Sequence, residues 1–396
     1  MISRRSMLGV SAAALAAPVL GRFLPFQASA AAAPDTFTLR VVNDSGAGAA
    51  YAYVTGTSPD DRIVVLKPDG TPYYPPSPAE QTPLEDCAIP LQGSGTELTV
   101  PRMSGARVYI ATEEKLEFFV NPGPALVAPS FLDENDANYQ KNWSFCEFTF
   151  NDTQLYANIS YVDFVSIPLG LYLTTSSSGE QTVAGLPAGA IDVIAGELAK
   201  QQDAEWGQLV HGDGPVRVVS PHYREDLFTD YLAGYIDEAW QKYTGETLTV
   251  DTQRPELGKV NGKVGGDGKL TFDGAESFGK PVTADVFSCD TGPFQIKEGD
   301  SDVRKAIVPR LAAALNRTTL RDNPNQPHGE DPNNFYQNSA TNHYARIVHQ
   351  NLPDNRGYAF PYDDVAPEGV DFSGAVIAGD PEVLTVTVSA MHTQRR

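Results

Sequence analysis

A succession of short strand patterns, which fills residues 36–180, constrains the fold more than any other feature of this sequence. Runs with period-two alternation or β-branched residues, such as TFTLRVVND, AAYAYVTG, DRIVVLKP and GTELTVPRM, are separated by clusters of Gly, Pro, Asn and Asp. These turn residues recur at short and fairly even intervals, which is typical of a β-sandwich or a β-barrel. The sequence therefore predicts an all-β unit in its first half.

The pattern changes to helical periodicity after residue 180. Apolar residues recur at helical spacing in the segments 187–202, 224–245, 301–317 and 339–351. A last strand pattern, EVLTVTVSA, occupies residues 382–390. We therefore predict a mainly β fold with an α/β part. In it, a β domain of residues 36–180 and 355–392 carries an inserted α/β domain of residues 181–354.

Residues 1–30 have the composition of an export signal. Arg4 and Arg5 precede the apolar run VSAAALAAPVL, and residues 28–30 read Ala-Ser-Ala, a small-residue cleavage site. The paired arginines indicate the twin-arginine route. The apolar run is too short and too rich in alanine for a good bilayer span. We therefore expect a secreted protein, and a retained or lipidated N-terminal anchor is the alternative.

Charge and cysteine content argue against several kinds of partner and site. The net charge of −21 at pH 7 argues against nucleic acid and anionic membranes as partners, whereas a neutral polysaccharide is indifferent to it. Three cysteines, Cys87, Cys146 and Cys289, allow at most one disulfide, and a pairing of Cys87 with Cys289 stays open. No cysteine or histidine spacing indicates zinc. We expect no metal and no cofactor, and we expect the chain to act as a monomer.

The segment SFCEFTFN places an acidic residue in an otherwise apolar strand. If Cys146 and Phe148 face the core, strand alternation puts Glu147, Thr149 and Asn151 on the opposite face. That face offers a carboxylate, a hydroxyl and an amide beside aromatic rings. Such a surface suits a ligand that is rich in hydroxyl groups.

The following segment, YANISYVDF, adds a second acid on the opposite strand parity. Tyr156 and Ser160 share one face, while Asp163 falls on the other. For Asp163 to join the face of Glu147, the chain must bulge or twist between Ser160 and Asp163. A cleft lined by Asn, Thr, Ser, Tyr and two carboxylates has the composition of a sugar site, and two carboxylates flanking a glycosidic bond suffice for its hydrolysis. Solvated strand decoration is the simpler explanation of the same two acids.

Four longer segments carry a resemblance: FFVNPGPALVAPS (118–130), SFCEFTFN (144–151), YANISYVDFVSIPLGL (156–171) and GYAFPYDDV (357–365). They resemble glycoside hydrolase family 64, the β-1,3-glucanases of the laminaripentaose-producing type, and matching blocks run in order from about residue 36 to residue 390. The resemblance implies a thaumatin-like β-sandwich or barrel domain plus a mixed α/β domain, with a wide groove between them. It also implies endo-type hydrolysis of β-1,3-glucan such as laminarin, curdlan or fungal cell-wall glucan, with short products such as the pentaose.

The resemblance also implies a role for each candidate site residue. Glu147 is the implied general acid and Asp163 the implied general base of an inverting mechanism, whose carboxyl groups lie about 6.5–9.5 Å apart. The implied glucan contacts are Thr149, Asn151, Tyr156 and Ser160. At Tyr156 and Ser160 the family pattern leads us to expect Trp and Thr. These departures affect subsite affinity and product length more than the chemistry.

The remaining polar candidates have structural as well as functional explanations. Asp363 and Asp364 are adjacent, so one of them lines an acidic cleft, or they accept backbone N–H bonds in a turn. His343 and His349 lie six residues apart on a predicted helix, which is a poor spacing for a metal site. With Arg346, they are expected to brace the domain junction. The alternative to an enzyme is a thaumatin-like protein that binds glucan without turnover, and the presence of both acids favours the enzyme.

Overall fold

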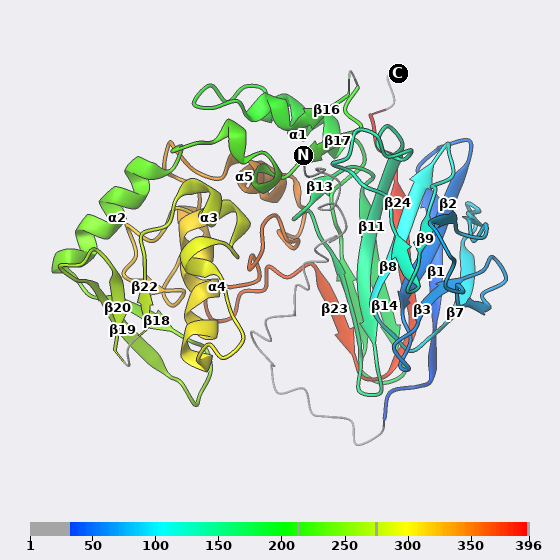
Figure 1. The fold of residues 1–396 in the computed structure, drawn as a ribbon, viewed down its shortest axis with the longest axis horizontal. Helices are drawn as coiled ribbons and strands as arrows, with labels where there is room; N and C mark the ends of the chain where they lie inside the picture. Colours follow the sequence, from blue (N-terminus) through cyan, green and yellow to red (C-terminus); the bar gives the residue numbers. More distant parts are fainter. Residues whose placement is uncertain (1–31, 213, 274–275, 394–396) are drawn as a thin grey trace, which may run out of the picture.

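The computed structural model describes residues 32–212, 214–273 and 276–393, so the predicted export signal lies outside the described residues. Figure 1 shows the longest strands together on the right of the molecule, and most of the helices with a smaller sheet on the left. The described α-helices all fall within residues 190–351. The fold is therefore mainly β, as the strand patterns predicted.

One side of the molecule is a sandwich of two sheets. The first sheet contains β1 Thr36–Asp44, β7 Thr96–Pro101, β14 Leu169–Thr175, β15 Glu180–Val183 and β24 Pro381–Ser389. These strands are hydrogen-bonded in the order β15–β14–β24–β1–β7, and β24 runs parallel to β1 with Val386 opposite Val41. The C-terminal strand therefore lies inside this sheet beside the N-terminal strand, red next to blue in Figure 1.

The second sheet supplies the surface on which the site is built. It contains β2 Ala50–Thr57, β3 Ile63–Leu66, β4 Pro72–Tyr73, β6 Ile89–Pro90, β8 Met103–Thr112, β11 Asn142–Phe150, β12 Leu155–Ile159 and β23 Ala375–Ala378. The order is β23–β12–β11–β8–β2–β3–β4, and β6 also pairs with β2. Alternate residues of both sheets, among them Leu39, Val386, Cys146 and Phe148, form one buried core.

The outer face of the second sheet is also covered over part of its length. A separate buried group, here called the outer aromatic cluster, contains Tyr53, Tyr109, Trp143, Phe145 and Phe164 together with Ala88, Ala111, Leu116 and Phe118. The small sheet beside it consists of β5 Thr82–Pro83, β9 Phe119–Asn121 and β10 Ala125–Val127. Near the outer aromatic cluster, both faces of the second sheet are therefore buried.

The other side of the molecule combines helices with a five-stranded sheet. The helices are α1 Ala190–Leu198, α2 Ala233–Gly245, α3 Thr283–Ser288, α4 Asp302–Asn316 and α5 His343–Asn351. The sheet contains β18 Leu248–Asp251, β19 Lys259–Val264, β20 Leu270–Phe272, β21 Ser277–Phe278 and β22 Asn325–Gln326. Its order is β21–β20–β19–β18–β22.

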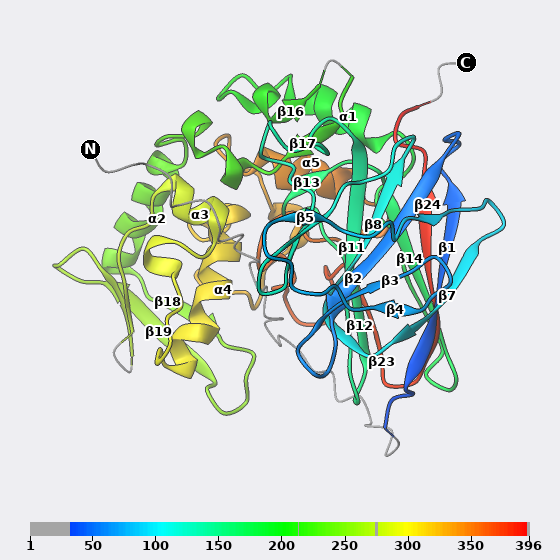
Figure 2. The same ribbon diagram turned by 45° about the vertical axis from the view of Figure 1, so that its right-hand side comes forward.

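A small three-stranded sheet, here called the junction sheet, joins these parts. It contains β13 Phe164–Val165, β16 Val210–His211 and β17 Arg217–Val219. Figure 2 shows it with α1 and α5 between the sandwich and the helices α2, α3 and α4. The short 3-10 helices are Trp206–Leu209, Pro221–Tyr223, Glu225–Leu227, Gly292–Phe294 and Pro332–Asn334.

One predicted helix is shorter than its sequence pattern. The segment 224–245 forms an α-helix only from Ala233, the start of α2. Asp230 takes a left-handed backbone conformation (φ 57°), which an α-helix does not accommodate. The Leu232 N–H is satisfied instead by the Thr283 hydroxyl at 2.9 Å. A tertiary contact from α3 therefore determines where α2 begins.

The cysteines answer one question that the sequence raised. Cys87, Cys146 and Cys289 are all buried and unpaired, so Cys87 and Cys289 form no disulfide. Burial raises the pKa of Cys146 to about 12, which makes it an inert thiol. Over the described ranges, no helix is long and apolar enough to cross a membrane.

Candidate active site

Glu147 lies in the middle of the second sheet, on β11 between β8 and β12. It stands opposite Arg107 of β8 and Asn158 of β12. Arg107 Nε donates to Glu147 Oε1 at 3.0 Å, and both side chains are 33% exposed. The carboxylate is therefore held by a charged donor and is still accessible to a ligand.

Strand alternation along β11 confirms the predicted parity. Cys146 and Phe148 are buried in the sandwich core, whereas Phe145 belongs to the outer aromatic cluster. The Arg107 guanidinium lies 4.4 Å from the centre of the Phe145 ring. Because the parity that buries Phe145 also directs Glu147 to the outer face, the carboxylate lies where the cluster meets polar surface.

Asp163 reaches the site through a change of sheet. After the end of β12, Ser160 forms a single bridge to Tyr358, and the chain bends at residues 162–163. Phe164 then begins β13, which pairs with β17 in the junction sheet. The predicted break between Ser160 and Asp163 is present, but it is an exchange of strand partners rather than a bulge.

A tyrosine from a remote segment holds Asp163. Tyr223 Oη donates to Asp163 Oδ1 at 2.6 Å, and the Ser220 N–H donates to the Asp163 carbonyl oxygen at 2.9 Å. The Tyr223 ring packs edge-on against Phe131 and beside His222. Burial, reinforced by Asp163, raises the pKa of Tyr223 well above its ordinary value, so the hydroxyl stays protonated and donates.

The two carboxylates share one electrostatic environment. Burial lowers the pKa of Arg107, but attraction to Tyr109, Glu147 and Asp163 outweighs it, and the net direction is upward. Burial raises the pKa of Tyr109, and Arg107 opposes this rise. Glu147 and Asp163 raise the pKa of Tyr109 further. Glu147 acts on Arg107 through a direct contact of 3.0 Å, and Asp163 adds to the same rise in pKa.

Two of the predicted glucan contacts share the face of Glu147. Thr149 and Tyr156 stand opposite each other on β11 and β12, one pleat along from Glu147. The Thr149 hydroxyl accepts from the Gly105 N–H at 3.3 Å, and the Tyr156 hydroxyl lies 3.2 Å from that of Tyr358. Both side chains are partly exposed. They are placed to touch a ligand that also reaches Glu147.

Asn151 and Ser160 lie at the margins of this face, and both have local structural partners. Asn151 follows the end of β11, and its Oδ1 accepts from the Thr153 N–H and hydroxyl and from the Gln154 N–H. The Ser160 hydroxyl accepts from the Val162 N–H at 3.2 Å. The role of these two side chains in glucan binding stays a prediction.

The sequence reasoning missed three residues that contact the candidate site. Arg107 reaches Glu147 through the register of β8 on β11, and Tyr223 reaches Asp163 across 60 residues of sequence. Tyr358 meets Tyr156 across 202 residues. No local periodicity marks any of them, and the only signal was that Tyr358 lies in the family-like segment GYAFPYDDV.

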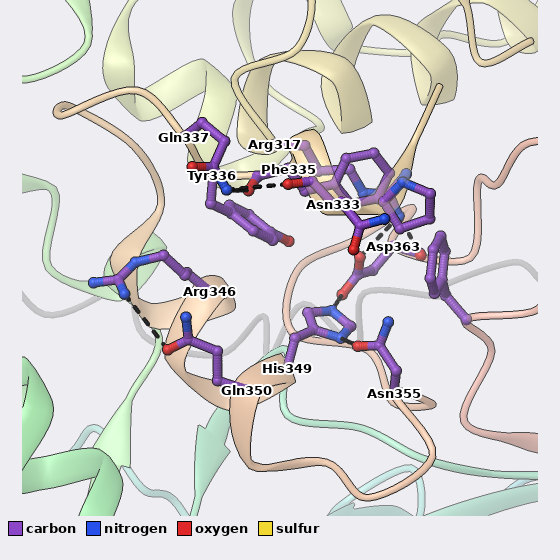
Figure 3. Close-up of a pocket in the computed structure, with 12 residues that line it drawn as sticks. Arg317, Asn333, Phe335, Tyr336, Gln337, Arg346, His349, Gln350, Asn355 and Asp363 are labelled. Atoms are coloured by element: carbon purple, nitrogen blue, oxygen red, sulfur yellow. Dashed lines mark hydrogen bonds and ion pairs between the residues drawn. The ribbon is translucent and has the colours of Figure 1, made fainter. Parts of the chain in front are cut away.

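The first of the adjacent acids, Asp363, is structural. It is 1% exposed, accepts from Arg317 Nη2 at 3.0 Å and lies 2.7 Å from His349 Nε2 (Figure 3). The Ala359 N–H also donates to its carboxylate at 2.9 Å. All of these contacts fix the loop that carries it, so the turn explanation holds for Asp363.

The second acid, Asp364, faces the tyrosines near the site. Burial, and then the neighbouring Asp363, raise the pKa of Asp364 to about 6. Burial raises the pKa of Tyr156 to about 12, and Asp364 contributes to that rise and to those of Tyr358 and Tyr362. The charge of this carboxylate therefore acts on the tyrosine pair that joins β12 to the loop of residues 357–365.

Replacing Asp364 by Asn is expected to stabilise the fold at neutral pH. The pKa of about 6 in the folded protein exceeds the ordinary value of 3.8, so ionisation in the folded state costs free energy. This cost develops as the pH rises from about 4 to about 6 and is constant above. We expect the variant to gain about 3 kcal/mol of unfolding free energy above pH 6, and little below pH 4. Urea unfolding between pH 4 and 7.5 measures this difference.

Asp380→Asn is the matched control with the opposite sign. Burial raises the pKa of Asp380, but hydrogen bonds from Ser177, Ser178 and Ser176 outweigh this effect and lower it to about 2. Its ionised form therefore stabilises the folded state above pH 4, and that contribution is lost as the pH falls toward 2. An Asp364→Asn variant that loses stability relative to the parent protein as the pH rises from 4 to 7 contradicts the first prediction.

His343 and Arg346 brace the first turn of α5. His343 Nε2 lies 3.1 Å from Asp203 Oδ2, and Arg346 Nε donates to His343 Nδ1 at 3.1 Å. The Tyr231 hydroxyl donates to the same Asp203 oxygen at 2.6 Å. These contacts tie α5 to the segment that follows α1. In the described part of the chain, no group of His, Cys, Asp and Glu is arranged to hold a metal ion.

Comparison with known proteins relates most of the chain to one family. The family model of the glycoside hydrolase family 64 β-1,3-glucanases matches residues 35–388. A glucan endo-1,3-β-glucosidase of Arthrobacter sp. (strain YCWD3) is 31% identical over 407 residues, which cover 97% of this chain and 72% of that protein. A glucan endo-1,3-β-glucosidase of Cellulosimicrobium cellulans has the same identity and coverage.

Two solved structures share the fold. A laminaripentaose-producing β-1,3-glucanase in complex with laminaritetraose has a TM-score of 0.79 and 32% identity, covering 90% of this chain and 99% of that one. The β-1,3-glucanase domain from Clostridium beijerinckii has a TM-score of 0.72 and 24% identity, covering 90% and 98%. At that lower identity, the second likeness concerns the fold alone.

Proposed function

This chain belongs to glycoside hydrolase family 64 and is an endo-β-1,3-glucanase, and we propose that it is a secreted enzyme that cleaves laminarin, curdlan and fungal cell-wall glucan with inversion at the anomeric carbon. Glu147 is the general acid and Asp163 the general base. The products are short laminari-oligosaccharides such as the pentaose. The export pattern in residues 1–30 supports secretion.

The observation that carries this proposal is the way in which the two carboxylates are held. Arg107 donates to one oxygen of Glu147, and Tyr223 donates to one oxygen of Asp163. Among the described residues, Glu147 Oε2 and Asp163 Oδ2 accept no hydrogen bond. Each carboxyl group is therefore oriented by one donor and keeps its other oxygen for a proton or a water molecule.

This arrangement supports a single displacement. Glu147, protonated on its free oxygen, gives its proton to the glycosidic oxygen as the bond from that oxygen to the anomeric carbon breaks. Asp163 takes a proton from a water molecule, whose oxygen attacks the same carbon from the opposite face. Inversion needs room for that water, so we expect the two carboxyl groups to lie about 6.5–9.5 Å apart when glucan is bound.

The tyrosines near β12 supply a place for the sugar rings. Tyr156 is partly exposed on the face of Glu147, and its hydroxyl is fixed by Tyr358 at 3.2 Å. An oriented aromatic face covers the apolar C–H face of a pyranose, and its hydroxyl competes for the sugar hydroxyls. Thr149, across the strand from Tyr156, adds a further hydroxyl. These contacts support a glucan chain that runs along β12 toward Glu147.

NMR of a curdlan digest tests the proposal. With inversion, the α-anomer of the reducing end appears first and the β-anomer grows in only by mutarotation. First appearance of the β-anomer contradicts the single displacement. Binding of curdlan without release of sugar favours the non-catalytic alternative, and faster release from barley glucan or cellulose contradicts the preference for β-1,3 bonds.

A further inference from the structure

We propose that a pocket beside α5 binds one glucosyl unit of the glucan away from the site of cleavage, an inference that rests on the substrate proposed above. The pocket is lined by the end of α4, the segment 332–337, α5 and the segment 355–372 (Figure 3). None of its lining residues comes from β11, from β12 or from the bend at residues 162–163. It is therefore built independently of Glu147 and Asp163.

The base of the pocket is aromatic and carries no net charge. The Arg317 guanidinium lies 4.7 Å from the Phe335 ring and 5.2 Å from the Phe372 ring, and it is paired with the buried Asp363. The Tyr336 ring stacks on His349 at 6.4 Å between centres. Because the two buried charges neutralise each other, the base favours an uncharged ligand with an apolar face over an ion.

The rim of the pocket carries four exposed amide side chains, namely Asn333, Gln337, Gln350 and Asn355, together with the partly exposed Arg346, whose guanidinium donates to His343 Nδ1 and Gln350 Oε1. Three of these amide side chains are held at one end by the protein. Asn333 Nδ2 donates to Asp331 Oδ1 at 2.8 Å, and Gln337 Nε2 donates to the Asn333 carbonyl oxygen at 3.1 Å. Asn355 Oδ1 lies 2.9 Å from His349 Nδ1. Their orientation is therefore set before a ligand arrives, which reduces the entropy lost on binding.

The other ends of these amides match the hydroxyls of a sugar. Within the described structure, Asn333 Oδ1 and Gln337 Oε1 accept no hydrogen bond, and Gln350 Nε2 donates none. A pyranose offers hydroxyls that both donate and accept, and its C–H face suits an aromatic base.

The cavity volume of about 240 Å³ is below the roughly 300–1,000 Å³ of pockets for drug-sized ligands. A single ring fits this space better than an oligosaccharide.

A second contact with the same polysaccharide raises the effective affinity for a long or insoluble glucan and leaves short soluble substrates unaffected. The test is therefore a ratio of activities. The double variant Asn333→Ala/Gln350→Ala removes two exposed rim amides, and Gln208→Ala/Gln241→Ala removes two exposed amides outside the pocket. We expect the pocket variant to lose at least about threefold in activity on curdlan and to keep its activity on soluble laminarihexaose.

Binding without turnover gives a second readout. Co-sedimentation with curdlan, in a Glu147→Gln background, is expected to fall by at least about threefold on adding the pocket substitutions and to be unchanged on adding the control pair. An unchanged curdlan-to-laminarihexaose ratio together with unchanged co-sedimentation, in an enzyme that does cleave curdlan, overturns the pocket alone. A parent protein that releases no sugar from either substrate overturns the proposed function and this inference with it.

Discussion

Replacing Glu147 by Gln is expected to lower kcat on curdlan by about 10²–10⁴-fold, the contribution of a positioned general acid. Gln keeps the size of the side chain and an oxygen that accepts from Arg107, which now stands 3.0 Å from Glu147. It has no acidic proton to give to the glycosidic oxygen. Initial rates of reducing-sugar release from curdlan measure the loss, and an unchanged circular dichroism spectrum excludes unfolding as its cause.

A substrate with a better leaving group separates the acid from the base. Fluoride leaves without protonation, so Glu147→Gln is expected to cleave a laminari-oligosaccharyl fluoride with less than about a tenfold loss, whereas Asp163→Asn stays impaired on both substrates. The matched control is Glu97→Gln, because Glu97 also has a cross-strand arginine, Arg40, at 4.0 Å on the other sheet. Retention of more than about a tenth of the curdlan activity by Glu147→Gln contradicts its role as the acid.

Replacing Arg317 by Met is expected to cost about 3–5 kcal/mol of unfolding free energy, because it leaves a buried carboxylate without its cation. Arg317 and Asp363 are each 1% exposed, and the Arg317 guanidinium also donates to the Asp363 and Val365 carbonyl oxygens. Burial raises the pKa of Asp363, but His349 and Arg317 outweigh it and hold that pKa below its ordinary value. Removing Arg317 therefore removes both a charge and several hydrogen bonds.

Urea unfolding of Arg317→Met and Arg321→Met makes the comparison. Arg321 pairs with Glu238 at 2.7 Å and Asp322 at 3.0 Å, but both carboxylates are largely exposed, so its loss is expected to cost about 0–1 kcal/mol. A cost below about 1 kcal/mol for Arg317→Met contradicts the prediction. The double variant with Asp363→Asn is expected to recover part of the loss, because it no longer buries an unpaired carboxylate.

The buried pair of Arg317 and Asp363 also supports the loop that meets the candidate active site. Arg317 and His349 fix Asp363, and the Asp363 carboxylate accepts from the Ala359 N–H in the same loop. That loop carries Tyr358, whose hydroxyl meets Tyr156, and Asp364, whose charge acts on both tyrosines. Loss of Arg317 is therefore expected to weaken glucan binding along β12 as well as the fold.

Local periodicity was sufficient to predict which way residues point along a strand. On β11, the alternation that buries Cys146 and Phe148 also directs Glu147 and Thr149 to the outer face, as predicted from SFCEFTFN. This prediction succeeds because successive side chains of a strand point to opposite faces wherever the strand is placed. Periodicity failed over the first part of 224–245, because the left-handed Asp230 and a contact from α3 set the start of α2.

By itself, the sequence determined the mainly β class, the face that Glu147 occupies and the family to which the chain belongs. Only the tertiary structure decided that Asp163 leaves β12 for another sheet, that Arg107 pairs with Glu147 and that Tyr223 holds Asp163. The physical reason is the range of the interactions. Strand parity is set by neighbouring residues, whereas register, exchange of strand partners and contacts between distant segments depend on how the whole core packs.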